Sequence, residues 1–250
     1  MTQPDHLLNF VRQCNLATTE EQLFGLLDET TKRLGFERFA MGHHVDLTGP
    51  PADAVRLTTY DPNWVEIAVE ARLFVDDPIH AASSKTAVGF LWSDVGKLIE
   101  LTDRQKATLE AARKFGLAEG FTVPVHVPGE YQGTCSFGAR SLEKLAPDAL
   151  PQAQLVGTFA FEAARRILRA RRRPADIGQI PSLTERQISC ITLVAMGKSD
   201  WEIGRILNIS EATAHEHVEA ARKRYGVSKR TQLVIRALFD GQISFSDILN

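Results

Sequence analysis

The side chains best placed to do chemistry in this sequence lie on one face of a predicted helix near its C-terminal end. Between Ser210 and Gly226, apolar residues recur every three or four positions and form the stripe Ala214, Val218, Ala221 and Tyr225. Because that stripe must face a core, the opposite side faces outward with His215, Glu216, Glu219, Arg222 and Lys223. An outward helix that can donate and accept hydrogen bonds in this way fits the major groove of DNA.

Three further helices are predicted to support the outward one. The first spans 184–196, where Thr184 and Gln187 have capping-box spacing, and the second spans 200–207 after Ser199. Only "NIS" separates the second helix from the outward helix, which is too short for antiparallel packing, so the two cross steeply as a helix-turn-helix. A fourth helix opens at Ser228 and stops at Gly241. The alternative is a four-helix protein-interaction module with a solvated polar face, which a DNA gel shift would exclude.

The earlier part of the chain alternates between helical and strand patterns. Helical periodicity covers 5–16, 20–34, 63–74, 103–116 and 151–172, and strand-like stretches cover 36–45, 54–60, 120–127 and 133–139. Strands joined as hairpins and interleaved with helices predict an α+β fold, an α/β/α sandwich around an antiparallel sheet. The stretch "RRRPADIGQIPSL" then marks a boundary, so we predict a domain over 1–172, a linker over 173–182 and a helix-turn-helix domain over 183–250.

Charge is distributed unevenly along the chain. The formal net charge is −2, but residues 1–164 hold 14 basic and 22 acidic side chains, and residues 165–173 add six arginines and no acid. A basic segment after an acidic body suggests that one end meets a polyanion. There is no apolar run of membrane-spanning length and no secretory signal, and the three cysteines lack metal-ligand spacing. We therefore expect a cytoplasmic protein without membrane contact, metal or cofactor.

The C-terminal region resembles the DNA-binding domain of LuxR-type transcription regulators. The resemblance rests on Leu183–Thr184, Arg186, Gly197–Lys198, Glu202–Ile203, "ISEAT", His217 and "GVSKRTQ". Gln187 and Ala214 are mild departures. It implies that His215 and Glu219 read bases, with His215 donating to guanine and Glu219 accepting from a cytosine amino group. Alternatively, Glu216 and Glu219 mainly repel non-specific DNA. The implied DNA-binding residues are Ser199, Trp201, Thr213, His215, Glu216, Glu219, Arg222, Lys223, Lys229 and Arg230, of which Ser199, Trp201, Lys223, Lys229 and Arg230 would contact phosphates.

The N-terminal region is similar to the autoinducer-binding domain of the same family, on Tyr60, Trp64, Asp77–Pro78, Trp92, Gly120 and Ser136. The resemblance implies an N-acyl- or aryl-homoserine lactone as ligand. Trp64 would donate to the lactone carbonyl, Asp77 would accept the amide N–H, Tyr60 and Ser136 would donate to the acyl carbonyl, and Trp92 would pack against the lactone ring. The alternative is that both tryptophans are core residues and that Asp77 only caps a helix.

Ala68 departs from the family pattern, which has a tyrosine at this position along the ligand. The smaller side chain opens space, and Thr122, Thr134 and Gln132 add polarity to the expected pocket wall. A branched, aromatic or bulky acyl group, or a ligand outside the lactone class, fits this departure better than a short simple chain. The implied ligand-binding residues are Tyr60, Trp64, Ala68, Asp77, Trp92, Thr122 and Ser136.

These observations together predict a ligand-responsive transcriptional regulator of quorum sensing that binds an inverted-repeat operator as a homodimer. Dimer contacts are expected along 231–240 and 152–172, and RNA polymerase is a further candidate partner. One alternative is a LuxR-type orphan regulator that answers a non-lactone molecule or acts without ligand. An enzyme acting on lactones is a weaker alternative, because the sequence has no G-x-S-x-G elbow and no H-x-H cluster.

Overall fold

The computed structural model of the chain describes residues 3–50, 54–127, 131–171 and 180–249. Contacts divide the chain into an N-terminal unit, Met1–His126 with Tyr131–Ile177, and a C-terminal unit that includes Gly178–Asn250. Most of the predicted linker, 173–179, lies outside the described residues. Within the described part of the chain, no helix combines the length and apolar character needed to cross a membrane.

The centre of the N-terminal unit is a five-stranded antiparallel sheet with strand order β2-β1-β5-β4-β3. Its strands are β1 Arg38–His43, β2 Arg56–Thr58, β3 Phe90–Leu91, β4 Glu119–Val125 and β5 Gly133–Ala139. The predicted hairpin is confirmed, since β4 and β5 pair in the register Phe121↔Phe137 and Thr122↔Ser136. Side chains alternate along each strand, so one face of the sheet receives the odd-numbered core residues and the other face receives the even-numbered ones.

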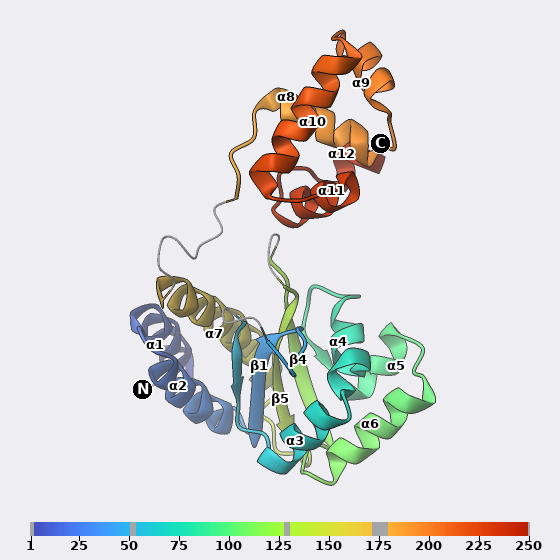
Figure 1. Cartoon of the computed structure of the whole chain (residues 1–250). Helices are drawn as coiled ribbons and strands as arrows, with labels where there is room; N and C mark the ends of the chain where they lie inside the picture. The colour runs from blue at the N-terminus through green and yellow to red at the C-terminus, as the bar shows by residue number, and fades with distance from the viewer. Residues whose placement is uncertain (1–2, 51–53, 128–130, 172–179, 250) are drawn as a thin grey trace. The chain divides into compact units, whose positions relative to one another are not determined.

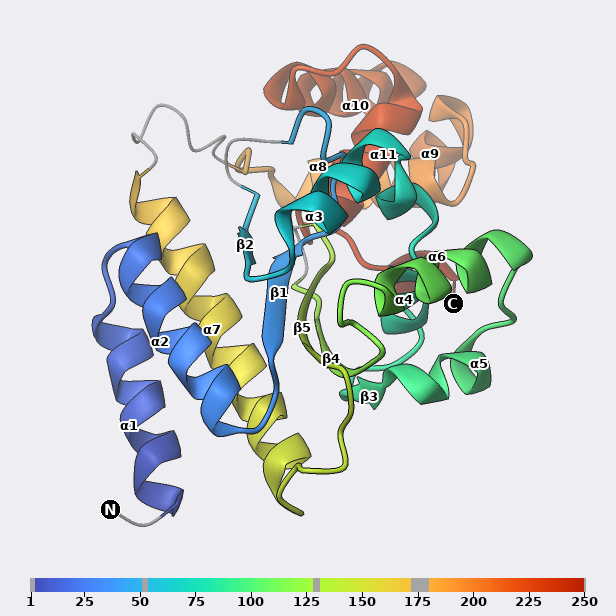
Figure 2. The ribbon, with the colours of Figure 1, turned by 90° about the horizontal axis from the view of Figure 1, so that it is seen from below.

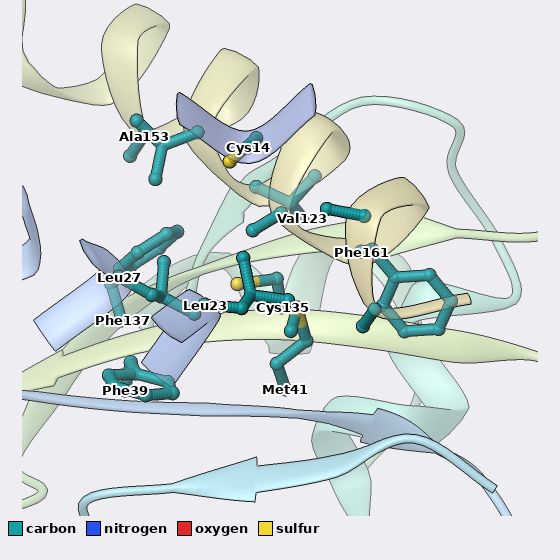
Figure 3. Close-up of a cluster of buried hydrophobic side chains, with 14 of the residues drawn as sticks. Cys14, Leu23, Leu27, Phe39, Met41, Val123, Cys135, Phe137, Ala153 and Phe161 are labelled. Carbon is teal, nitrogen blue, oxygen red and sulfur yellow. The ribbon is translucent and has the colours of Figure 1, made fainter. Parts of the chain in front are cut away.

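Three long helices cover the first face of this sheet: α1 Gln3–Leu16, α2 Glu20–Arg33 and α7 Ala149–Arg171 (Figures 1 and 2). Phe39 and Met41 from β1 and Phe137 from β5 pack there against Leu23 of α2 and Phe161 of α7, all nearly inaccessible to water (Figure 3). Burying apolar side chains of this size stabilises a fold by roughly 1.5–3 kcal/mol each. This cluster therefore holds the sheet rigid beneath whatever the opposite face binds.

Four shorter helices lie over the opposite face, on the other side of the sheet from α1, α2 and α7 (Figure 2). They are α3 Pro62–Glu70, α4 Pro78–Ser83, α5 Val95–Leu98 and α6 Asp103–Arg113, with 3-10 turns at Leu73–Asp76 and Trp92–Asp94. The three-layer α/β/α arrangement is therefore confirmed. The sequence patterns missed α5 and β3, and they indicated α4 only through the alternative that Asp77 caps a helix. Each of these elements has at most six residues, too few for periodicity to be visible.

The C-terminal unit consists, in its described part, of the helices α8 Glu185–Ala195, α9 Asp200–Leu207, α10 Glu211–Tyr225, α11 Arg230–Phe239 and α12 Phe245–Leu249. The predicted capping box of Thr184 with Gln187 is confirmed. Ser199 with Glu202 forms a second complete capping box, and Ser210 caps α10. Two details differ from the sequence-based expectation. Lys229 rather than Ser228 occupies the N-cap of α11, and the short α12 adds a fifth helix.

The tight corner between α9 and α10 depends on two residues. Asn208 adopts a left-handed conformation at φ 54° and ends α9, which asparagine tolerates better than most residues. A Cβ atom on Gly204 would lie 2.8 Å from the carbonyl oxygen of Ile209, so only glycine lets the turn fold back this closely. Ala214, Val218 and Ala221 of α10 are fully buried in the core of this unit, which confirms the inward stripe.

Candidate ligand cavity and DNA-binding surface

A cavity of about 530 Å³ opens between the sheet and the helices α3, α4 and α6. This volume lies within the range of small-molecule sites. Six of the seven residues predicted to bind ligand line it: Tyr60, Trp64, Ala68, Asp77, Trp92 and Ser136. They come from α3 and the loop before it, the start of α4, the second 3-10 turn and β5, so the fold brings together segments that are far apart in sequence.

Thr122 is the exception, because it does not line the cavity but supports residues that do. The indole Nε1–H of Trp92 donates to Thr122 Oγ1 at 2.9 Å, and Thr122 Oγ1 lies 2.8 Å from Ser136 Oγ. An indole nitrogen can only donate, so Thr122 accepts from Trp92 and is free to donate its own proton to Ser136. When Thr122 donates in this way, Ser136 keeps its hydroxyl proton for a group in the cavity. We call this chain of hydrogen bonds the Trp92–Thr122–Ser136 relay.

The ring of Trp92 rests on two glycines of the sheet. A Cβ on Gly120 would lie 2.5 Å from the indole, and a Cβ on Gly138 would lie 3.1 Å from it. Both glycines are on the even-numbered face that bounds the cavity, and they pair across β4 and β5. Gly120 is therefore required by close packing rather than by backbone conformation, and it fixes the height of the tryptophan ring above the sheet.

Asp77 both caps a helix and faces the cavity. One carboxylate oxygen, Oδ1, accepts from the backbone N–H groups of Ile79 at 2.7 Å and His80 at 3.3 Å, as the capping alternative predicts. The other oxygen has no hydrogen-bond partner among the described residues. Cap and ligand contact are therefore compatible roles, because they use different oxygens.

Tyr60 and Trp64 line the same cavity, and each side chain carries a hydrogen-bond donor. Burial, followed by the charge of Asp77 and then Cys135, raises the pKa of Tyr60 well above its usual value, so its phenol stays protonated and can donate. Trp64 is only 8% exposed and packs against Phe115 with ring centroids 5.5 Å apart. Within the described residues, neither the Tyr60 hydroxyl nor the Trp64 indole N–H has a hydrogen-bond partner.

Polar residues that the sequence did not single out lie at the other end of the cavity-facing surface. Arg56 and His80 line the cavity there. Thr134, which was expected in the pocket wall, lines it as well, whereas the expected Gln132 is exposed and does not. The ring of His44 stacks on His80 at 3.7 Å between centroids, and its Nε2 lies 3.2 Å from Thr134 Oγ1.

The stacked His44 is electrically neutral. Burial, and then the rings of His80, His126 and His43, lower the pKa of His44 to about 2. In the part of the chain that the structure describes, no group of three or more histidine, cysteine or acidic side chains could hold a metal ion. The four histidines His43, His44, His80 and His126 come together only in the folded chain. Their spacing in the sequence does not predict that they lie close to one another.

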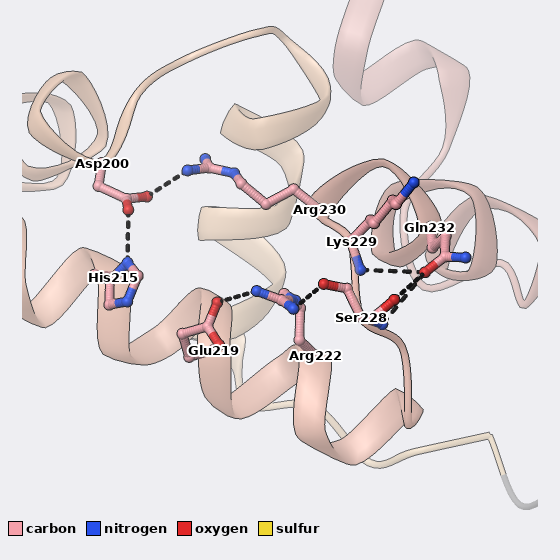
Figure 4. A network of polar contacts seen from close by, with 8 residues as sticks. All are labelled: Asp200, His215, Glu219, Arg222, Ser228, Lys229, Arg230 and Gln232. Atoms are coloured by element: carbon pink, nitrogen blue, oxygen red, sulfur yellow. Dashed lines mark hydrogen bonds and ion pairs between the residues drawn. The ribbon is translucent and has the colours of Figure 1, made fainter.

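In the C-terminal unit, the polar face of α10 is joined to its neighbours by a hydrogen-bonded network (Figure 4). Asp200 at the start of α9 accepts from His215 Nδ1 at 2.9 Å and from Arg230 Nη1 at 2.8 Å. Glu219 pairs with Arg222, whose guanidinium also donates to the Ser228 carbonyl. The Asp200 carboxylate thus links α9 to α10 through His215 and to α11 through Arg230.

The predicted DNA-binding residues differ in how free their side chains are. The hydroxyl of Ser199 donates to Glu202 at 2.8 Å within its capping box, and Thr213 Oγ1 lies 2.8 Å from Ser210 Oγ, so both hydroxyls are already engaged. Others are exposed, with no hydrogen bond or ion pair of their side chains to the described residues: Glu216, Lys223 and Lys229. Trp201 is also exposed, at 59%, with the Arg205 guanidinium over its ring.

Comparisons with known proteins agree for both units. Residues 19–164 match the family model described as "Autoinducer binding domain", and residues 181–237 match "Bacterial regulatory proteins, luxR family". The transcriptional activator protein BjaR1 of Bradyrhizobium diazoefficiens is 27% identical over 237 residues, which cover 92% of this chain and 93% of BjaR1. The quorum sensing-dependent regulator RpaR of Rhodopseudomonas palustris is 30% identical over 181 residues, 72% of each chain.

Solved structures share the fold. SdiA in complex with octanoyl-rac-glycerol has a TM-score of 0.68 at 22% identity and covers 98% of both chains, and a second crystal structure of Escherichia coli SdiA has a TM-score of 0.66 at 21% identity and covers 94% of this chain and 96% of SdiA. The matched domains, their order and the length of the matches all point to one family. The chain therefore belongs to the LuxR family of quorum-sensing transcriptional regulators, with an N-terminal autoinducer-binding domain and a C-terminal helix-turn-helix domain.

Proposed function

We propose that this regulator binds an N-acyl- or aryl-homoserine lactone in its cavity and thereby controls its binding to operator DNA. The observation that carries the proposal is that the Trp64 indole N–H, the Tyr60 hydroxyl and one Asp77 oxygen, all without partners among the described residues, face one largely apolar cavity together with Ser136. A homoserine lactone amide has a matching set of groups: two carbonyls, one amide N–H and an apolar tail.

Each polar residue then has one role. Trp64 donates to the lactone carbonyl, Asp77 accepts the amide N–H, and Tyr60 and Ser136 donate to the acyl carbonyl. Thr122 acts through the relay by orienting Ser136, and the ring of Trp92 packs against the lactone. A buried polar ligand group left without its partner costs about 1–3 kcal/mol, so each contact should change affinity measurably.

The DNA-binding part of the proposal uses the outward face of α10. His215 and Glu219 contact base edges, and the exposed Lys223 and Lys229 contact phosphates. We place the ligand domain at 1–172, the linker at 173–182 and the DNA-binding domain at 183–250. The protein acts in the cytoplasm, where operator DNA and RNA polymerase are available to it.

A homodimer on an inverted repeat is part of the same proposal, because two recognition helices double the set of base contacts. Two exposed apolar surfaces support it. Leu155 and Phe159 lie one helical turn apart on α7 and are 44% and 37% exposed, and Ile235 on α11 is 62% exposed. Apolar side chains in these positions suit contact with a second copy of the chain.

Thermal unfolding of the full chain with a panel of acyl- and aryl-homoserine lactones tests the ligand assignment. A lactone at ~100 times its dissociation constant should stabilise the protein by about 2.7 kcal/mol, and its ring-opened homoserine counterpart should stabilise it much less. Trp64→Phe keeps an aromatic ring but removes the indole donor, so it should weaken the lactone about tenfold. If no lactone shifts the melting temperature, the ligand assignment is wrong.

A second candidate is a family member that answers a small molecule outside the lactone class. Ala68 favours it by widening the cavity where the family has a tyrosine, and the related fold of SdiA was solved with octanoyl-rac-glycerol. Including that glycerol ester in the same melting series separates the two candidates. Stabilisation by the ester alone would favour the second.

A further inference from the structure

The cavity-facing side of the sheet carries two parallel rows of residues. In the first row Thr58, Ala40, Ser136 and Thr122 stand side by side, and in the second row Arg56, Gly42, Thr134 and Pro124 do so. The rows are two residues apart along each strand, which corresponds to about 7 Å. The first row holds the relay serine, and Thr134 of the second row lies about 7 Å from Ser136 along β5. Arg56 belongs to the same second row but lies two strands to the side, roughly 10 Å away, so its long side chain has to reach across β1 toward Thr134.

The second row contains two hydrogen-bond donors, Arg56 and Thr134, and no carboxylate that could accept from them. Arg56 and Thr134 both line the cavity, and Arg56 has no ion pair or hydrogen bond to the rest of the described chain. Asp77 is the sole carboxylate among the residues that line the described cavity, and it belongs to the end that holds the polar head of the ligand. His80 lines the cavity on the side of Arg56, stacked on the neutral ring of His44. Among the residues that line the described cavity, Arg56 is the sole arginine or lysine, so it supplies the fixed positive charge on that side.

We infer that the ligand carries a carboxylate at the far end of its acyl group, about 7 Å from the amide carbonyl, and that Arg56 and Thr134 bind this carboxylate. The ligand class is then a homoserine lactone amide of a dicarboxylic acid. A guanidinium presents paired donors that match a carboxylate. Thr134 Oγ1 lies 3.2 Å from His44 Nε2, and when His44 donates in that contact the Thr134 hydroxyl keeps its proton for a third hydrogen bond. This inference rests on the proposed function and specifies the far end of the same cavity.

The apolar walls between the two polar ends fit a connecting hydrocarbon segment. Val65, Val69, Leu73 and Phe74 line the cavity from α3 and the turn that follows it. An extended adipoyl group places its second carboxylate roughly 7 Å from its amide carbonyl, the separation of the two rows. An alkyl chain of the same length would fill the same walls but would leave Arg56 without a partner.

The test compares two ligands of equal shape on the full-length protein by calorimetric titration. One is N-adipoyl-homoserine lactone with its free carboxylate, and the other replaces that carboxylate by a branched dimethyl end. Because Arg56 is exposed to solvent, its ion pair is screened, and we expect the wild type to prefer the carboxylate about fivefold. Arg56→Met should abolish the preference, Arg56→Lys should keep most of it, and Arg113→Met, an exposed arginine outside the cavity, should leave it unchanged.

The outcomes separate this inference from the function on which it rests. Binding of both ligands with no preference for the carboxylate, or a preference that survives Arg56→Met, overturns the inference and leaves the lactone assignment standing. Failure of both ligands, and of every other lactone, to bind overturns the two together. If Arg56→Met loses the preference for the carboxylate while Arg56→Lys and Arg113→Met retain it, the result supports Arg56 as the residue that binds the ligand carboxylate.

Discussion

The replacement Thr122→Val tests whether the relay, rather than direct contact, connects Thr122 to the ligand. Valine has nearly the shape of threonine, but it removes the acceptor for Trp92 Nε1–H at 2.9 Å and the partner of Ser136 at 2.8 Å. A polar group left unpaired costs about 1–3 kcal/mol, and we expect the lower end because Trp92 is only half-buried. The melting temperature of the ligand-free protein should therefore fall by roughly 2–4 °C.

Ligand affinity should fall as well, by roughly fivefold, because Ser136 loses the hydrogen bond that directs its proton into the cavity. Thr108→Val is the matched control, since Thr108 lines the cavity but its hydroxyl donates to the Arg104 carbonyl of its own helix. In a double-mutant cycle, Ser136→Ala should cost much less in the Thr122→Val background than in the wild type. Independent, additive losses would show that the relay does not exist in function.

Four further predictions concern other parts of the molecule. Gly120→Ala should prevent stable folding, since its Cβ would lie 2.5 Å from Trp92, whereas Gly96→Ala, with no atom within 4 Å of the new Cβ, should melt near the wild type in circular dichroism. Glu219→Ala should change base preference at one operator position in a binding-site selection, and an unchanged selected site would refute direct reading. Phe159→Glu should weaken self-association in sedimentation experiments, because it places a charge on the exposed apolar surface of α7. The pKa of His44 is lowered from 6.5 to about 2 in the folded protein, so as the pH falls below 6.5 the unfolded chain takes up a proton at His44 and the folded protein does not. The contribution of neutral His44 to the free energy of unfolding is therefore fully present above pH 6.5 and decreases below it. At about pH 5.5 the free energy of unfolding measured in urea titrations should be lower by roughly 1 kcal/mol, and His44→Gln should remove this loss.

Features fixed by neighbouring residues could be predicted from the sequence. The capping boxes at Thr184 and Ser199 and the buried stripe of α10 depend on spacings within a few positions, and they lie where expected. The function of Thr122 could not be predicted, because its contact with Ser136 depends on the register of β4 against β5. Arg56 was missed for a similar reason: its strand has three residues, and only pairing with β1 places it on the cavity side.

The chemistry of His215 shows most clearly what a long-range contact adds. Its Nδ1 lies 2.9 Å from a carboxylate oxygen of Asp200, a residue 15 positions earlier in the sequence. A carboxylate only accepts, so the ring must carry a proton on Nδ1 in either charge state. Nε2 is then an acceptor when the ring is neutral, which suits the amino groups of adenine and cytosine rather than the guanine expected from residue type. Donation to guanine requires the doubly protonated ring. Under the proposed reading of a base by His215, the contact with Asp200 would therefore favour adenine or cytosine at that position.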